Sequence, residues 1–196
     1  MKKESFQKLV LTGVFAALSY VVFTFLQIKI PLPGGDRAAR EPWRMASSVL
    51  EALGRGDEIA ERFREKPNSG MIRKVIANPR LSGVTTAMGR WFDAASALLG
   101  LCLTQHDEAT AAMRLESAAE GKTPREFGKL WEILPDGSLS LLPLMAMLAD
   151  TPHEPDAVSQ ASADFHEGVA RALSDWILQL TGPDEADLPL CLAGGC

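Results

Sequence analysis

The sequence has 196 residues, of which 46% are hydrophobic and 23% charged, enough for one domain of ordinary size or somewhat more. The formal net charge of −5 argues against a nucleic-acid-binding protein, because such proteins usually carry a basic surface. Three cysteines without a CxxC pair support neither a disulfide framework nor a zinc site, and they fit a reducing compartment.

At the segment 31–36, PLPGGD, the basic residues change from lysines alone to mostly arginines. Every basic residue before Asp36 is a lysine, whereas all twelve arginines follow it. Two prolines and two glycines within six residues cannot continue a helix. These observations predict a junction between two unrelated sequences, residues 1–30 and residues 31–196.

Residues 9–28 form an uncharged apolar run behind a basic leader. At 1.5 Å per residue the run is long enough to cross about 30 Å of hydrocarbon, so we predict a membrane helix with a cytoplasmic N-terminus. Two alternatives stay open. One is a signal-like segment, although the run is longer than usual and no Ala-x-Ala site follows it. The other is a helix buried in a globular core.

After this run the pattern is α/β and predominantly helical. Apolar spacing predicts helices at 37–53, 58–63, 71–76, 90–103, 108–119, 142–148 and 164–180. A loop is expected at 81–89, a hairpin at 131–141 around Pro135-Asp-Gly137, and a strand at 188–193. The last helix carries the clearest signals, because Asp164 and Glu167 resemble a capping box and Phe165 begins a buried face.

The helix predicted at 90–103 carries a candidate binding residue. Its apolar stripe comprises Trp91, Ala95, Leu98, Leu99 and Cys102. Asp93, Ala97 and Gly100 share a different face, where one carboxylate among small residues would let a ligand approach the backbone. The alternative is that Asp93 is an acid of the first turn, stabilised by the helix dipole.

Metal and phosphate sites have weaker signals. His106, His153 and His166 are dispersed and show no metal-binding spacing, so no metal site is predicted. Gly194-Gly195 follows the strand expected at 188–193, and a glycine pair there exposes backbone N–H groups that suit an anion. Such pairs are also common at strand ends without any function.

Two resemblances extend this interpretation. Residues 15–36 resemble the opening of the substrate-binding S component of energy-coupling-factor vitamin transporters, although no second uncharged run of about 18 residues follows, so a complete transporter is excluded. The chain from 31 resembles the latter part of the C-terminal transferase domain of the hydrogenase maturation carbamoyltransferase family, HypF. The blocks that carry this resemblance are PLPGGDRAAREPWR at 31–44, TTAMGRWFDA at 85–94, LLG at 98–100, Glu108 with AAM at 111–113 and LE at 115–116, FH at 165–166 and LAGG at 192–195.

The second resemblance implies a partial actin/hexokinase-like (ASKHA) fold and a reaction. Members of the family make carbamoyl adenylate from carbamoyl phosphate and ATP, and pass the carbamoyl group to the C-terminal cysteine of a partner protein in nickel–iron hydrogenase maturation. By resemblance, the nucleotide would be bound by Asp93, Glu108, Gly194 and Gly195, and the loop leading to Asp93 would be shaped by Thr85, Thr86, Gly89 and Arg90. The family's metal ligands have no counterpart here. Ala109 stands where glycine is expected.

The function expected from the sequence is therefore that of a carbamoyltransferase fragment, inactive by itself and cytoplasmic over residues 31–196. If residues 9–28 are a genuine membrane helix, the fragment would be anchored to a membrane. Two alternatives stay open: a fragment of a transporter S component, and a chimeric or degraded gene product without a selected function.

Overall fold

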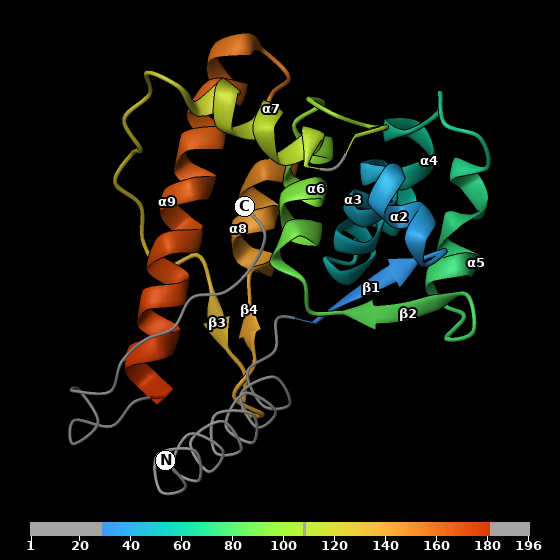
Figure 1. The fold of residues 1–196 in the computed structure, drawn as a ribbon, viewed down its shortest axis with the longest axis horizontal. Coiled ribbons are helices and arrows are strands. Elements are labelled where there is room, and N and C mark those ends of the chain that lie inside the picture. The colour runs from blue at the N-terminus through green and yellow to red at the C-terminus, as the bar shows by residue number, and fades with distance from the viewer. Residues whose placement is uncertain (1–28, 108, 181–196) are drawn as a thin grey trace, which may run out of the picture.

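The computed structural model describes residues 29–107 and 109–180 (Figure 1). The predicted membrane helix at 9–28, Glu108, the strand at 188–193 and the Gly194-Gly195 pair lie outside these residues. Within the described ranges, no helix combines the length and the apolar character that a membrane crossing requires.

The described chain is mostly helical, with two small antiparallel sheets. Its first half contains β1 (Ile30–Pro33), α2 (Asp36–Arg40), α3 (Pro42–Ala52), η1 (Gly56–Glu58), α4 (Ile59–Arg62), η2 (Ser69–Met71), α5 (Ile72–Ile76) and β2 (Ser82–Thr85). Its second half contains α6 (Met88–Leu98), α7 (Thr110–Ala119), β3 (Glu132–Ile133), β4 (Leu139–Ser140), α8 (Leu142–Ala149) and α9 (Pro155–Leu180). In Figure 1, α6 lies between the α2–α5 group and the α7–α9 group. It packs against both α3 and α7.

The predicted helix 37–53 is wrong in one respect, because it consists of two helices, α2 and α3. Proline disfavours the helical conformation of the residue before it, and Glu41 accordingly has φ −123° and ψ 75°. Pro42 then begins α3, where its missing N–H costs nothing. The apolar spacing that predicts this helix comes from Met45, Val49 and Leu53. Met45 and Val49 are fully buried, and Leu53 is partly buried against the same core.

The segment 31–36 contains part of a strand in addition to a turn. β1 pairs antiparallel with β2, in the register Ile30↔Thr85 to Pro33↔Ser82, so the loop predicted at 81–89 is wrong over its first half. Prolines are tolerated in β1 because, among the residues that the structure describes, β2 is its one neighbouring strand. Ile30, which the sequence placed before the junction, is buried in the same core as α3.

The hairpin prediction is confirmed. β3 pairs antiparallel with β4, and Gly137 in the connecting turn has φ +79°, a conformation that glycine adopts easily. The carbonyl oxygen of Gly137 accepts a hydrogen bond of 2.8 Å from Nε1 of Trp176. Since Trp176 lies on α9, this bond fixes the hairpin to the last helix.

Helix α9 begins nine residues before the predicted start, at Pro155 instead of Asp164. The predicted capping box is therefore wrong, because Asp164 lies in the middle of the helix and is completely buried. Phe165 is buried as predicted. At Gly168 the neighbouring helix α8 comes close, since a Cβ atom there would lie 2.7 Å from Cδ1 of Leu144.

The remaining predicted helices are confirmed with shifted ends. They are η1 with α4, α5, α6, α7 and α8. Helix α6 ends at Leu98, several residues before the predicted end, and Gly100 just beyond it has φ +74°. A glycine in this conformation is a common helix terminator.

Candidate functional site

Asp93 lies in the second turn of α6 and is only 2% exposed. One turn earlier, Arg90 places its Nη1 atom 2.7 Å from Oδ2 of Asp93. Neither of these two atoms makes a hydrogen bond within the described residues, so their contact is one of charge. Asp93 is therefore a buried, ion-paired carboxylate and more than a surface acid at a helix start.

Gln105 completes the surroundings of Asp93 and was missed by the sequence interpretation. It lies in the loop between α6 and α7, and its Nε2 donates a hydrogen bond of 3.2 Å to Oδ1 of Asp93. A lone glutamine in a loop has no periodicity and belongs to no motif. Only the folded chain brings it to the carboxylate.

Burial raises the pKa of Asp93 to about 6, because the charged form loses its hydration. The positive charge of Arg90 and the hydrogen bond from Gln105 act in the opposite direction but do not outweigh burial. The carboxyl group therefore exchanges its proton close to neutral pH, which is typical of groups in functional sites and also occurs in structural ion pairs.

This pKa predicts a pH dependence of stability. The folded state holds the Asp93 proton up to about pH 6, whereas the unfolded chain releases it near the ordinary value of 3.8. The free energy of unfolding should therefore fall by about 2 kcal/mol as pH rises from about 4 to about 7. Asp93→Asn removes this titration, so urea unfolding of both proteins across that range isolates it. Parallel curves for the two proteins would contradict the assignment.

The four residues predicted to shape the approach to Asp93 all lie on the connection from β2 to α6. Thr85 ends β2, and its Oγ1 accepts a hydrogen bond of 3.2 Å from the backbone N–H of Ala87. Thr86 follows it, and Gly89 and Arg90 belong to the first turn of α6. Of the four, Arg90 is the one that contacts the carboxylate of Asp93.

The other small residues of the Asp93 face border an opening. Ala97 and Gly100 line a pocket of about 270 Å³, together with residues 61–66 and His153. Asp93 does not line it. The volume is slightly below the range of about 300–1,000 Å³ that is usual for small-molecule sites. Ala97 and Gly100 of the predicted face therefore border a pocket, whereas the carboxylate of Asp93 lies outside it, against Arg90 and Gln105.

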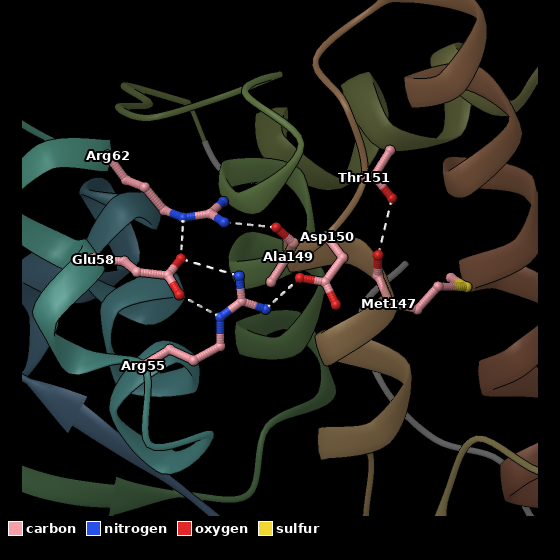
Figure 2. A network of polar contacts seen from close by, with 7 residues as sticks. All are labelled: Arg55, Glu58, Arg62, Met147, Ala149, Asp150 and Thr151. Carbon is pink, nitrogen blue, oxygen red and sulfur yellow. Dashed lines mark hydrogen bonds and ion pairs between the residues drawn. The ribbon is translucent and has the colours of Figure 1, made fainter.

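One wall of this pocket is fixed by a polar network between α4 and the end of α8, shown in Figure 2. Arg62 donates from Nη2 to the carbonyl oxygen of Ala149 at 2.7 Å and from Nε to Glu58 at 2.9 Å. Arg55 binds the same Glu58 and also Asp150, at 2.6 Å each. The hydrogen bond from Arg55 is the main reason why the pKa of Glu58 is lowered. The network connects helices that lie far apart in the sequence.

The three histidines lie at different positions in the fold and do not form a group. Nε2 of His153 lies 3.0 Å from the carbonyl oxygen of Leu98, and Nδ1 of His166 lies 2.7 Å from that of Ser162. His106 is exposed. Among the residues that the structure describes, no three His, Cys, Asp or Glu side chains are grouped to hold a metal ion.

Ala109 confirms the position of a tight turn before α7. It has φ +64°, in the left-handed region that glycine adopts without cost and alanine does not. Ala109→Gly should therefore raise the free energy of unfolding by about 1 kcal/mol. The matched control is Ala112→Gly inside α7, which should lower it by about 1 kcal/mol. Thermal unfolding of both variants measures the difference, and a loss of stability in both would contradict the prediction.

Comparison with known proteins identifies relatives of this chain. A family model described as "Carbamoyltransferase, Kae1-like Domain, second subdomain" matches residues 24–196, so the match begins before the segment 31–36. The chain is 37% identical over 199 residues to carbamoyltransferase HypF2 of Cupriavidus necator, and 34% identical over 167 residues to carbamoyltransferase HypF of Rhizobium leguminosarum bv. viciae. These alignments cover 86% and 85% of this chain, but 24% and 21% of the relatives.

Solved structures agree with the sequence relatives. The crystal structure of full-length HypF in the phosphate- and nucleotide-bound form matches with a TM-score of 0.62 and 25% identity, over 80% of this chain and 25% of that one. The crystal structure of T. kodakarensis HypF has the same fold, with a TM-score of 0.60 and 21% identity over 80% of this chain and 22% of that one. The resemblance of residues 15–36 to a transporter S component stays a prediction. The chain belongs to the HypF carbamoyltransferase family and corresponds to the second subdomain of its Kae1-like domain.

Proposed function

We propose that this chain supplies one wall of the nucleotide-binding cleft of a HypF-type carbamoyltransferase, with Asp93 as the residue that contacts the ribose. The observation that carries the proposal is the buried Asp93 carboxylate, held between Arg90 and Gln105 at the helix that follows the Thr85–Gly89 connection. A carboxylate can accept hydrogen bonds from two sugar hydroxyls, and such bonds to a charged group are among the stronger ones.

The proposed reaction is transfer of a carbamoyl group from carbamoyl adenylate to the C-terminal cysteine of a hydrogenase maturation partner, in the cytoplasm. Because the chain spans about a quarter or less of the first two relatives described above, this whole-protein activity is one to which it would contribute. Glu108, Gly194 and Gly195 remain predicted nucleotide contacts. The actin/hexokinase-like fold of the whole domain and the absence of turnover by this chain alone also stay predictions.

Titration calorimetry with ATP tests the proposal. Asp93→Ala should weaken binding at least tenfold, which corresponds to a loss of about 1.4 kcal/mol from hydrogen bonds to a charged group. Asp156→Ala, which removes an exposed aspartate of α9 far along the chain, should leave the affinity unchanged. Equal affinities of the wild type and Asp93→Ala would overturn the role of Asp93, and no binding by the wild type would overturn the proposed function.

Attachment to a membrane through residues 9–28 is a separate proposal, because those residues lie outside the described ranges. It rests on the length and the apolar character of the run. Fractionation of cells that express the chain with and without residues 1–28 tests it. Recovery of both forms in the soluble fraction would contradict it.

A further inference from the structure

Gln105 is 5% exposed and makes four hydrogen bonds that join three helices. Its Nε2 donates to the carbonyl oxygen of Ala39 at 2.6 Å and to Oδ1 of Asp93 at 3.2 Å. Its Oε1 accepts from the backbone N–H of Ala111 at 2.8 Å, and its own backbone N–H donates to the carbonyl oxygen of Arg40 at 2.9 Å.

Three of these bonds satisfy groups that helices leave unpaired at their ends. Ala39 and Arg40 are the last residues of α2, and Ala111 is the second residue of α7. The last carbonyl groups and the first N–H groups of a helix have no partner within that helix. Gln105 thus caps α2 and α7 together, and the position of its amide is fixed from both sides.

The fourth bond is directed at Asp93, and within the described residues it is the one hydrogen bond that this carboxylate accepts. We infer that Gln105 is the positioning residue that orients the carboxylate of Asp93 for its ligand, an inference that rests on the proposed nucleotide site. An amide suits this role because it donates two hydrogen bonds and accepts one at the same place. Glutamate would lose both donors, and methionine would lose all three bonds.

Two readouts are needed: the titration of Asp93 shows whether Gln105 holds the charged carboxylate, and the affinity for ATP shows whether this contact serves ligand binding. We would follow the carboxyl carbon of Asp93 by NMR as a function of pH, without nucleotide, in the wild type and in Gln105→Met. Loss of the hydrogen bond to the charged form should raise the pKa of Asp93 further above its present value of about 6. In calorimetry, the same variant should bind ATP about tenfold more weakly.

The chain offers a matched control in α9. Gln160 also donates from Nε2 to a carbonyl oxygen, that of Thr123 at 2.9 Å, and to an aspartate, Asp164 at 3.0 Å. Gln160→Met therefore removes the same pair of donated hydrogen bonds, one to a carbonyl oxygen and one to an aspartate, at another place. It should leave both the titration of Asp93 and the affinity for ATP unchanged, whatever its effect on stability.

Gln105→Glu covers the case in which Gln105→Met fails to fold. It keeps an acceptor for the N–H of Ala111 but removes the donor to Asp93, so its deciding readout is the affinity for ATP, which should fall about tenfold. The inference is overturned if a folded variant at position 105 leaves the titration of Asp93 and the affinity for ATP as in the wild type. If the wild type does not bind ATP, the proposed function fails, whereas the titration still decides whether Gln105 positions the carboxylate.

Discussion

Trp43→Ala is expected to lower the free energy of unfolding by about 3–5 kcal/mol, a large part of the stability of an ordinary domain. Trp43 is fully buried at the start of α3. Its ring centroid lies 5.9 Å from that of Phe63, and the guanidinium of Arg44 lies 5.0 Å from the ring centroid of Trp43. Alanine would leave a cavity among these groups, and the surrounding helices could close it only in part.

Urea unfolding followed by circular dichroism measures this effect. Leu178→Ala is the control, because Leu178 is 70% exposed on α9 and its truncation should change the free energy of unfolding by less than about 0.5 kcal/mol. Trp43→Phe keeps an aromatic ring and should cost less than Trp43→Ala. Similar losses for Trp43→Ala and Leu178→Ala would show that Trp43 does not lie in the core.

The sequence predicts the core of the helices well, because helical spacing is a local property. The apolar stripe predicted for the helix at 90–103 is buried throughout, on α6 itself (Trp91, Ala95 and Leu98) and in the residues that follow its end (Leu99 and Cys102). Met45 and Val49 on α3 are buried as well. In each case the residues that face the core lie within a few helical turns of one another. Their spacing can therefore be recognised without knowing how the rest of the chain folds.

Pairing over long distances could not be read from the sequence. β1 and β2 are separated by about fifty residues, and each is short and rich in proline or glycine, which normally indicates a turn. The start of α9 was missed for a related reason. Residues 155–163 carry mixed polar and small side chains, which give no clear helical pattern. Asp164 therefore resembles a helix N-cap, whereas in the structure its carboxylate binds Arg125 of the irregular 120–131 segment.

The candidate site likewise has a part that local sequence predicts and a part that only the fold reveals. Asp93 was identified from its place on α6 and from the resemblance of GRWFDA, both of which are local. Its burial and the hydrogen bond from Gln105 depend on a loop twelve residues away that folds back between α2 and α7. A hydrogen-bonding partner that is alone in its segment leaves no pattern. For this reason the carboxylate could be predicted, but not the residue that holds it.

Asp164→Ala is expected to lower the free energy of unfolding by about 3 kcal/mol, because it removes a buried carboxylate that accepts several hydrogen bonds, one of them from a charged guanidinium. The side chain of Asp164 is 1% exposed. Its oxygens accept hydrogen bonds from the backbone N–H and from Nε of Arg125, at 2.8 Å each, and one from Gln160 at 3.0 Å. These bonds attach the irregular segment that contains Arg125 to the middle of α9, and alanine at position 164 would remove the acceptor on the helix for all of them.

Asp156→Ala is the matched control, because Asp156 lies on the same helix and also forms an ion pair, with Lys122 at 2.5 Å. Its side chain is 90% exposed, so water replaces the lost contact and the midpoint of urea unfolding should hardly move. The two variants therefore compare a buried aspartate with an exposed one, each paired with a basic residue of the 120–131 segment. Equal shifts of the midpoint would mean that the carboxylate of Asp164 is solvated in solution and not buried as described.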